Sequence, residues 1–290
     1  MSHFVFLPCL DSDEMADACR RDLWIDRADA RVLGATAVVA LECGFYYRQS
    51  DVLVDWSDQI MKARASRISL APQAPLPLHD KELFPETRIQ VMNKTTMQAA
   101  FDLVGEGHDP LALNFANGIS PGGGFLSGAR AQEEVLCRSS ALYSTLKNDA
   151  MYEFHRQRPR PDSTDWCILS PHVPVFRNDD GTELAEPWLL SFITSAAPYA
   201  PKIGQPESGD LLKKRIHRVL AIASAFGYKT LVLGAWGCGA FHNDPQRTAA
   251  DFREILMENF AGHFSHVLFA ITDWSPERKM LGPFRDVFSG

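Results

Sequence analysis

The segment covering residues 114–134 constrains the fold more than any other stretch. It starts in an apolar run at residues 111–115, passes through three consecutive glycines at residues 122–124, and resumes with a polar triplet at residues 132–134. A tight turn needs one glycine, whereas three in a row allow positive φ and a close approach of the backbone to a ligand. A buried strand, a glycine loop and a helix N-terminus in this order predict an α/β fold in which backbone N–H groups bind an anion.

Strands and helices alternate along the second part of the chain, residues 81–290. Apolar runs of strand length alternate with amphipathic segments of helix length. The predicted strands cover residues 87–92, 111–115, 173–177, 188–194, 230–233 and 267–272, and the predicted helices cover residues 95–107, 131–149, 210–226, 245–260 and 276–287. This alternation predicts a layered α/β sheet. Ligands of such sheets bind beyond the carboxyl ends of the strands, so we expect one site at the loops 114–124, 194–199, 234–241 and 272–274.

Residues 1–80 are predicted to form a helical extension that packs on this core. A long helix is expected over residues 11–48, with Gly44 as its stop. Residues 71–80 are rich in proline, which predicts an exposed connection. The prediction is therefore an extension, residues 1–80, and a catalytic core, residues 81–290, within one structural unit.

Charge and cysteine usage exclude several classes of protein. The net charge of −7 argues against binding to nucleic acid or to an anionic membrane, because either requires a clustered basic face. No apolar run approaches the roughly 18 residues that a membrane span requires, and the N-terminus lacks the pattern of a signal peptide. The 6 cysteines show neither a CxxC pair nor the spacing of zinc ligands. We therefore expect a cytoplasmic protein with free thiols and no metal site.

Two adjacent carboxyl groups, Glu133 and Glu134, follow the glycine loop. On a helix they point about 100° apart, so that one can face a site while the other reaches the loop. A single carboxyl that acts first as an acid and then as a base for water would suit hydrolysis of a glycosidic bond. The alternative is a pair of ordinary acids that the helix dipole favours in a first turn. The motifs GxxxxGK[ST] and GxGxxG are absent, which excludes a P-loop and a dinucleotide-binding fingerprint.

A second glycine loop at residues 234–241 follows an apolar strand and precedes a helix that Asp244 and Pro245 are expected to cap. By the same reasoning it can bind an anion. Phe241 is either a core residue or a stacking surface for a base or a ribose. Cys238 is either a nucleophile or, more commonly for cysteine, a small buried side chain.

These motifs resemble a known family. Three glycines, seven residues and then Gln-Glu-Glu at 132–134 look like the GGG-X(6–8)-QEE signature of poly(ADP-ribose) glycohydrolases. The stretches at 234–245, 194–198 and 42–46 are also similar to the microbial-type branch of that family. The resemblance covers essentially the whole chain. It implies a macrodomain-like three-layer α/β/α sandwich with a mixed central sheet.

The resemblance also implies roles for individual residues. Glu134 would be the catalytic acid and base, and Glu133 would contact ribose hydroxyls. Asn117 would orient the distal ribose. The glycine loop would lie along the diphosphate, and the second loop would close over the phosphates with Phe241 on the ribose and adenine side. The implied substrate-binding residues are Asn117, Gly122, Gly123, Gly124, Gln132, Ala197, Gly237, Cys238, Gly239, Ala240, Phe241 and Thr272.

The implied activity is hydrolysis of terminal ribose–ribose O-glycosidic bonds in poly(ADP-ribose), with release of ADP-ribose and no cofactor. The partners would be poly(ADP-ribose), ADP-ribose and ADP-ribosylated proteins. Two alternatives stay open: a non-catalytic macrodomain that binds ADP-ribose, and a mono-ADP-ribosyl hydrolase or O-acetyl-ADP-ribose deacetylase. Whether internal bonds are also cut depends on whether the segment at 272–288 closes the groove beyond the terminal unit.

Overall fold

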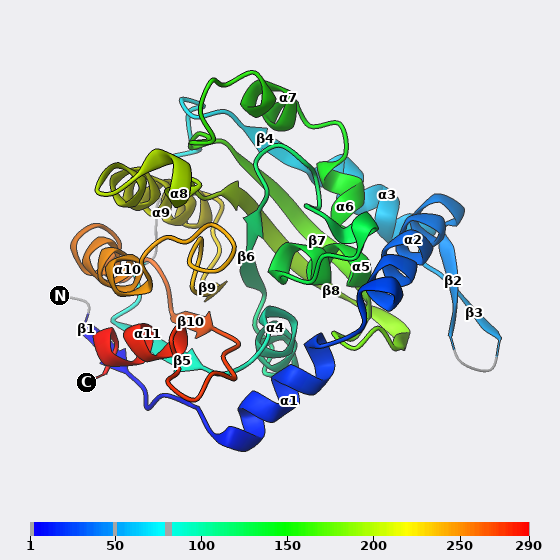
Figure 1. Ribbon diagram of the computed structural model, residues 1–290, viewed down its shortest axis with the longest axis horizontal. Helices are drawn as coiled ribbons and strands as arrows, with labels where there is room; N and C mark the ends of the chain where they lie inside the picture. Colours follow the sequence, from blue (N-terminus) through cyan, green and yellow to red (C-terminus); the bar gives the residue numbers. More distant parts are fainter. Residues whose placement is uncertain (1–2, 49–50, 79–82, 290) are drawn as a thin grey trace.

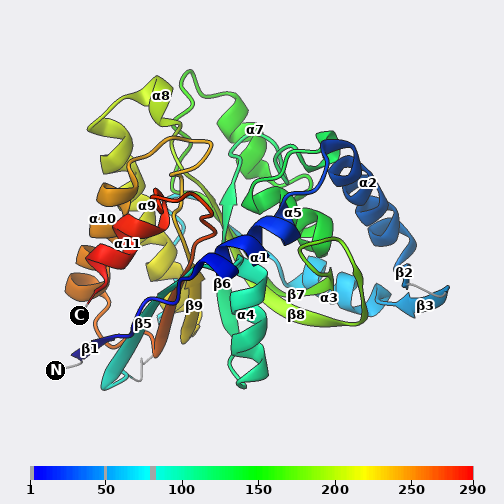
Figure 2. The same cartoon turned by 60° about the horizontal axis from the view of Figure 1, so that its bottom comes forward.

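A computed structural model describes residues 3–48, 51–78 and 83–289 and places a mixed eight-stranded sheet between two layers of helices (Figures 1 and 2). The strand order is β1-β5-β10-β9-β6-β8-β7-β4. The strands are β1 His3–Phe6, β4 Ile68–Leu70, β5 Glu86–Met92, β6 Pro110–Ala116, β7 Cys167–Arg177, β8 Glu183–Ala196, β9 Thr230–Leu233 and β10 His266–Ala270. All neighbours from β1 to β8 are parallel, whereas β7 is antiparallel to both β8 and β4. The predicted three-layer sandwich with a mixed sheet is confirmed.

Each face of the sheet packs on its own set of helices. One face is covered by α2 Arg27–Cys43, α3 Ser57–Ser66, α4 Thr96–Gly105, α5 Gln132–Ser139, α6 Leu142–Leu146 and α7 Ala150–Arg156. The other is covered by α9 Glu207–Ala225, α10 Pro245–Asn259 and α11 Leu281–Val287. Strand β6 shows why both are needed, because Leu111 and Leu113 belong to one buried cluster and Ala112 to the other. Burial of each leucine contributes about 2 kcal/mol to stability.

The predicted helix over residues 11–48 is wrong as a single element. It is two helices, α1 Asp13–Leu23 and α2, and residues 45–48 are strand β2 Phe45–Arg48, which pairs with β3 Val52–Asp55. The break follows from local capping, because the Asp26 carboxylate accepts a hydrogen bond from Ala28 N at 2.7 Å and starts a new helix. Gly44 does end α2, with a left-handed φ of 79°.

The first 80 residues also supply both edge strands of the main sheet. Strand β1 pairs with β5, and β4 pairs with β7. Strands of three or four residues are too short to show a period of two, so the sequence did not indicate them. The proposed boundary between residues 80 and 81 lies outside the described residues.

The predicted helix over residues 131–149 is also wrong as a single element, because it is divided into α5 and α6, and α7 begins only after it at Ala150. Helix α5 ends because Ser140 turns to an extended conformation and forms an isolated bridge with Val175 of β7. The Ser140 hydroxyl donates to Leu136 O at 2.7 Å and accepts from Leu142 N at 3.2 Å, which joins the two short helices.

Two global features complete the fold. Across residues 3–48, 51–78 and 83–289, no helix is both long enough and apolar enough to cross a membrane. All six cysteines are free thiols. The carboxyl ends of β5, β6, β8, β9 and β10 lie along one edge of the sheet, where their loops meet.

Candidate active site

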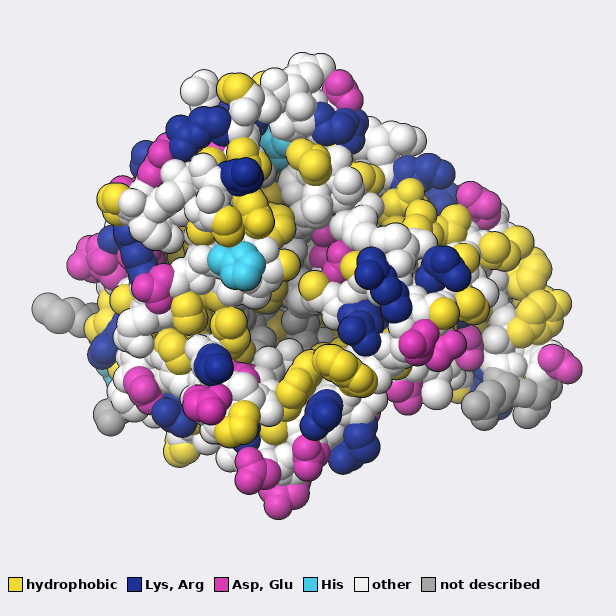
Figure 3. Space-filling model, viewed as in Figure 1, with side chains coloured by type: hydrophobic (Ala, Val, Ile, Leu, Met, Phe, Trp, Pro, Cys, Tyr) yellow, Lys and Arg dark blue, Asp and Glu magenta, His cyan; other side chains and the backbone are white. Residues whose placement is uncertain are grey.

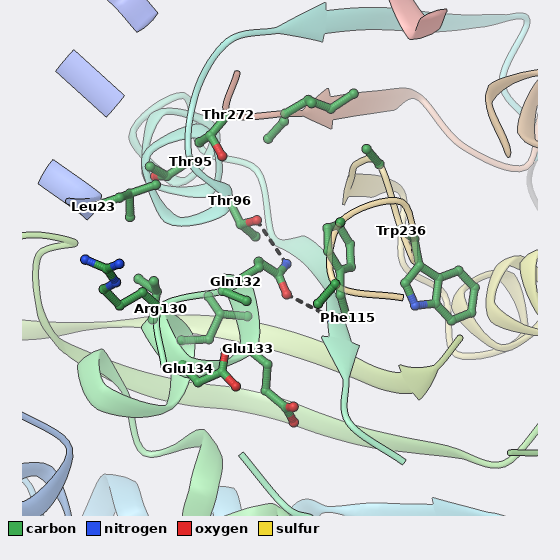
Figure 4. A pocket seen from close by; sticks show the side chains of 18 of the residues that line it. Leu23, Thr95, Thr96, Phe115, Arg130, Gln132, Glu133, Glu134, Trp236 and Thr272 are labelled. Carbon is green, nitrogen blue, oxygen red and sulfur yellow. Dashed lines mark hydrogen bonds between the residues drawn. The ribbon is translucent and has the colours of Figure 1, made fainter. Parts of the chain in front are cut away.

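A cavity of about 350 Å³ opens at the carboxyl edge of the sheet, where two neighbouring strands diverge (Figure 4). Strand β6 pairs with β9 only from Pro110 to Ala112, although it pairs with β8 as far as Ala116. The sheet therefore opens between β6 and β9. Of the residues predicted from the sequence, the cavity wall includes Asn117, Gln132, Glu133, Glu134, Ala197, Gly237, Gly239, Ala240, Phe241 and Thr272.

Gln132 forms hydrogen bonds with the part of strand β6 that is not paired with β9. Its Oε1 accepts a hydrogen bond from Phe115 N at 2.8 Å, and its Nε2 donates to Leu113 O at 2.7 Å and to Thr96 Oγ1 at 3.1 Å (Figure 4). These backbone groups lie on the side of β6 where its pairing with β9 has ended. The side chain thus replaces a missing strand and fixes the first residue of α5. The sequence predicted a contact with substrate, but every hydrogen-bonding atom of this amide already has a protein partner.

Replacing Gln132 by alanine should therefore loosen the start of α5. We expect a loss of about 1–3 kcal/mol of stability, because backbone groups of β6 lose their partners, and a fall in kcat/KM of about tenfold. Urea denaturation and steady-state kinetics would measure both. Gln157→Ala, which removes an exposed amide bonded to Glu153, is the matched control. Stability and activity equal to those of the control would refute this role.

Glu133 ties α5 to the loop that follows β6. Its Oε2 accepts a hydrogen bond from Asn117 N at 2.7 Å, and its Oε1 accepts from Gly122 N at 3.2 Å and from Asn114 Nδ2 at 3.4 Å. Burial raises the pKa of Glu133 to about 8, the donors from Asn117, Asn114 and Gly122 oppose the shift, and the nearby Glu134 carboxyl adds to it.

Glu134 differs from Glu133 in having one free oxygen. Its Oε1 accepts a hydrogen bond from Gly124 N at 2.8 Å, whereas its buried Oε2 has no partner among the described residues. The side chain is only 8% exposed and lines the cavity. A carboxyl with one oxygen fixed and the other available is suited to moving a proton at a defined position.

The three glycines of the first loop lie against these carboxyl groups. The amide groups of Gly122 and Gly124 donate to the two glutamates, and Gly123 N donates to Ser120 O at 3.0 Å. None of the three is among the residues of the cavity wall. The amides of Gly122, Gly123 and Gly124, which were predicted to bind phosphate, are therefore already bonded within their own segment, because the loop folds back onto α5.

The second glycine loop does present free donors. The amide groups of Gly239, Ala240 and Phe241 have no acceptor within the described part of the chain, and all three residues line the cavity. The loop is held by Asn243, whose Nδ2 donates to Pro198 O at 2.9 Å and to Gly237 O at 3.2 Å. Successive free amides of this kind are suited to a phosphate group.

Gly237 and Ala197 lie against each other in this wall. Gly237 has a φ of 77°, and a Cβ there would lie 2.8 Å from the Ala197 Cβ. Close contact and positive φ together require glycine. Phe241 is half-buried and packs edge-on against Tyr199, with ring centroids 5.9 Å apart. One face of this ring system is therefore available to a ligand.

The structure places Cys238 outside the cavity wall, contrary to its predicted place among the substrate-binding residues. It is 3% exposed, does not line the cavity, and directs its thiol toward Trp236 O at 3.6 Å. Burial raises the pKa of Cys238 to about 12. A thiol that stays protonated is neither a nucleophile nor an anion ligand. No group of three His, Cys, Asp or Glu side chains among residues 3–48, 51–78 and 83–289 could hold a metal ion.

The remaining predicted residues and several unpredicted ones complete the wall. Thr272 lies at the end of β10, and Asn117 uses its Oδ1 to accept from Ile119 N and Ser120 N, each at 3.0 Å. Thr95 and Trp274 were not predicted, although the Thr95–Gln98 capping box was readable in the sequence. Buried Asn114 also was not predicted, since only the fold brings it to Glu133.

Helix α7 supports the loop that holds Asn117. His155 is 4% exposed, and its Nδ1 lies 3.0 Å from Gly118 O, so this nitrogen donates and Nε2 accepts from Thr164 Oγ1 at 2.7 Å. Arg156 Nη1 donates to Ile119 O at 2.8 Å. Two successive side chains of α7 thus bind two successive carbonyl groups of the loop that contains Asn117.

The buried, neutral His155 predicts a loss of stability in acid. Burial lowers its pKa from 6.5 to about 4. The unfolded chain therefore binds more protons than the folded chain between these values, and the free energy of unfolding should fall as pH decreases from 6.5 to 4. Urea titrations at several pH values should show that the free energy of unfolding depends less steeply on pH in His155→Gln than in wild type. His172→Gln, at an exposed histidine, should keep the wild-type slope. Equal slopes for wild type and His155→Gln would contradict the prediction.

The sandwich, the divergence of β6 from β9 and the carboxyl pair at the start of α5 together define a macrodomain-like fold with a hydrolase-type site. Residues 35–178 match the family model of the microbial-type PARG catalytic domain, where PARG denotes poly(ADP-ribose) glycohydrolase. The chain belongs to the microbial-type poly(ADP-ribose) glycohydrolase family, a family of enzymes that hydrolyse glycosidic bonds. The resemblance read from the sequence is thereby confirmed.

Solved structures agree with this assignment. Poly(ADP-ribose) glycohydrolase from Thermomonospora curvata is 40% identical, with 90% of this chain and 99% of that chain covered and a TM-score of 0.84. The same enzyme bound to the inhibitor ADP-HPD is 39% identical, with coverage of 89% and 99% and a TM-score of 0.82. The enzyme from Deinococcus radiodurans in complex with ADP-ribose is 36% identical, with coverage of 79% and 96% and a TM-score of 0.72. A comparison with curated proteins found no match.

Proposed function

We propose that this protein hydrolyses the ribose–ribose O-glycosidic bond at the end of poly(ADP-ribose) and releases ADP-ribose. The observation that carries the proposal is Glu134, which lines the cavity, with Oε1 held by Gly124 N and a buried Oε2 that has no partner among the described residues. Family membership supports it, as do the solved relatives in complex with ADP-ribose and ADP-HPD.

The two sides of the cavity suit the two ends of an ADP-ribose unit. The free amides of Gly239, Ala240 and Phe241 would bind the diphosphate. The terminal ribose would then lie against Asn117 and the two glutamates. Holding the diphosphate at a fixed distance from Glu134 places the scissile bond next to the acid, which is catalysis by proximity.

The reaction would proceed through one carboxyl group. Both oxygens of Glu133 accept hydrogen bonds from N–H donors, whereas Oε2 of Glu134 has no partner among the described residues and would carry the proton that is transferred. As the bond between the anomeric carbon and the leaving oxygen breaks, Glu134 gives this proton to that oxygen, and the anomeric carbon gains oxocarbenium character. Glu134 then takes a proton from water, whose oxygen bonds to the anomeric carbon. One water is consumed and Glu134 is protonated again.

An exo-acting enzyme fits a cavity that the C-terminal segment partly encloses. Trp274 and Met280 from the C-terminal segment line the wall there. Trp24 packs edge-on against Trp274, with ring centroids 6.3 Å apart. The C-terminal segment thus encloses part of the cavity.

One assay with three substrates tests this function. Purified protein would be incubated with poly(ADP-ribose), with a mono-ADP-ribosylated protein and with O-acetyl-ADP-ribose. We expect free ADP-ribose from the polymer as the main product, without oligomers released from internal cuts. Turnover of either other substrate alone would instead support the hydrolase or deacetylase alternative. Calorimetric binding of ADP-ribose without turnover of any substrate would identify a reader.

A further inference from the structure

Two exposed arginines form what we call the arginine rim, Arg130 in the cavity wall and Arg27 at the adjoining start of α2. Arg130 lines the cavity, and Arg27 is the first residue of α2. Arg27 Nε donates to Ser127 O at 3.3 Å, which brings α2 to the loop before α5. Figure 3 shows Lys and Arg side chains gathered beside the central hollow, over the junction of α1 and α2. Arg31 follows Arg27 by one turn of the same helix and adds a third exposed positive charge.

The two arginines of the rim have no ion-pair partner among the described residues. Within the described residues neither Arg27 nor Arg130 has a carboxylate at ion-pair distance, whereas Arg156, Arg160 and Arg285 each have one. The protein as a whole carries a net charge of −7. A cluster of unpaired positive charge at one cavity mouth is therefore a local feature that the overall charge does not explain.

The nearest acids in sequence are directed elsewhere. The Asp26 carboxylate accepts a hydrogen bond from Ala28 N at the start of α2. Asp29 lies two residues from Arg27, about 200° around the helix. Neither carboxylate neutralises the rim.

The side chain of Arg130 is held in place, but not all of its N–H groups have a hydrogen-bond partner among the described residues. Its guanidinium lies 4.7 Å above the centre of the Trp24 ring, and its Nη1 donates to Ile25 O at 2.8 Å. Trp24 is 59% exposed and is fixed in turn by Trp274. The other N–H groups of Arg130 stay available, as do both terminal nitrogens of Arg27, for which no bond within the described chain is formed.

We infer that the arginine rim binds the diphosphate of the ADP-ribose unit on the leaving side of the scissile bond. This inference rests on the proposed function, because it concerns the remainder of the polymer. Arg130 lies four residues before Glu134, and both line the same cavity. The oxygen that Glu134 protonates belongs to the leaving unit, so the diphosphate of that unit must lie just outside the cavity. Planar guanidinium groups bind phosphate oxygens in pairs, which gives this position the matching chemistry.

Substitution of both arginines tests the inference. For Arg27→Ala/Arg130→Ala, we expect KM for poly(ADP-ribose) to rise by about tenfold, well beyond any change in the Kd of ADP-ribose, which lacks the leaving unit. The slope of log kcat/KM against log salt concentration should become shallower by about 1.4, from about 0.7 for each lost phosphate contact. Arg27→Lys/Arg130→Lys should restore most of the slope, because it keeps the charge.

A matched double variant controls for net charge. Arg48→Ala/Arg88→Ala removes two positive charges from exposed sites on β2 and on the amino half of β5, away from the cavity. It should keep the wild-type salt slope and KM. If the rim variant behaves like this control while the wild type cleaves polymer, the arginine rim does not bind the leaving unit. The proposed function would then still stand. A wild-type protein that does not cleave polymer would overturn the proposed function itself.

Discussion

Replacing Glu134 by glutamine should lower kcat for release of ADP-ribose by at least about 1000-fold, equivalent to about 4 kcal/mol of transition-state stabilisation. Glutamine has nearly the same shape, and its oxygen can still accept the hydrogen bond from Gly124 N. What it lacks is a proton that it can give to the leaving oxygen and take back from water. ADP-ribose binding, measured by calorimetry, should change by less than about threefold, because the amides of the second loop are untouched.

Two further variants make this result specific. Glu42→Gln removes an exposed carboxyl and should have no effect. Glu133→Gln should weaken both binding and turnover, because its side chain holds the amides of Asn117 and Gly122. Near-normal turnover by Glu134→Gln in a protein that still melts cooperatively would remove Glu134 from the reaction.

Replacing Gly123 by alanine should abolish most activity although neither glutamate is itself substituted. Gly123 has a φ of 57°, and a Cβ there would lie 2.3 Å from Glu134 Oε1 and 3.0 Å from Glu133 Oε2. The substitution therefore has to displace the carboxyl pair. We expect kcat/KM to fall by at least about 100-fold and stability to fall by about 1–3 kcal/mol.

Gly107 offers a control that separates backbone strain from displacement of the site. It has a φ of 86°, but a Cβ there would meet nothing within 4 Å. Gly107→Ala should lose about 1–2 kcal/mol of stability through its positive φ and keep its kcat. Denaturation and kinetics on both variants give the comparison. If the two alanines lowered activity equally, loss of stability alone would explain the effect of Gly123→Ala.

The arrangement of the loops shows where inference from the sequence reached its limit. Glycines in two strand–helix loops predicted two anion cradles by the same physical reasoning. Only the loop ending at Phe241 has amides free for a ligand, since the amides of Gly122, Gly123 and Gly124 are bonded within their own segment. A hydrogen-bond partner some ten residues away depends on how the loop folds, and composition does not encode that.

Short strands and breaks within helices were a second feature that could not be predicted from the sequence. Runs such as residues 87–92 and 230–233 were readable as strands because they are apolar and bounded by turn residues. The edge strands β1 and β4 were not, because three or four residues carry no measurable period. The divisions within residues 11–48 and 131–149 depend on caps and on a bridge between Ser140 and Val175, and helical periodicity continues across them.

The sequence by itself determined the class of fold, the family and the pair Glu133 and Glu134, because alternating periodicity and the GGG and QEE motifs are local patterns. Tertiary structure alone decided what each residue does. It placed Gln132 on the open side of β6, buried Cys238 away from the cavity, left one oxygen of Glu134 without a partner among the described residues and joined the start of α2 to the segment before α5 through Arg27 and Arg130. The physical reason is that hydrogen-bond satisfaction and burial are properties of residues that meet in space, and most of these meet across long separations in the chain.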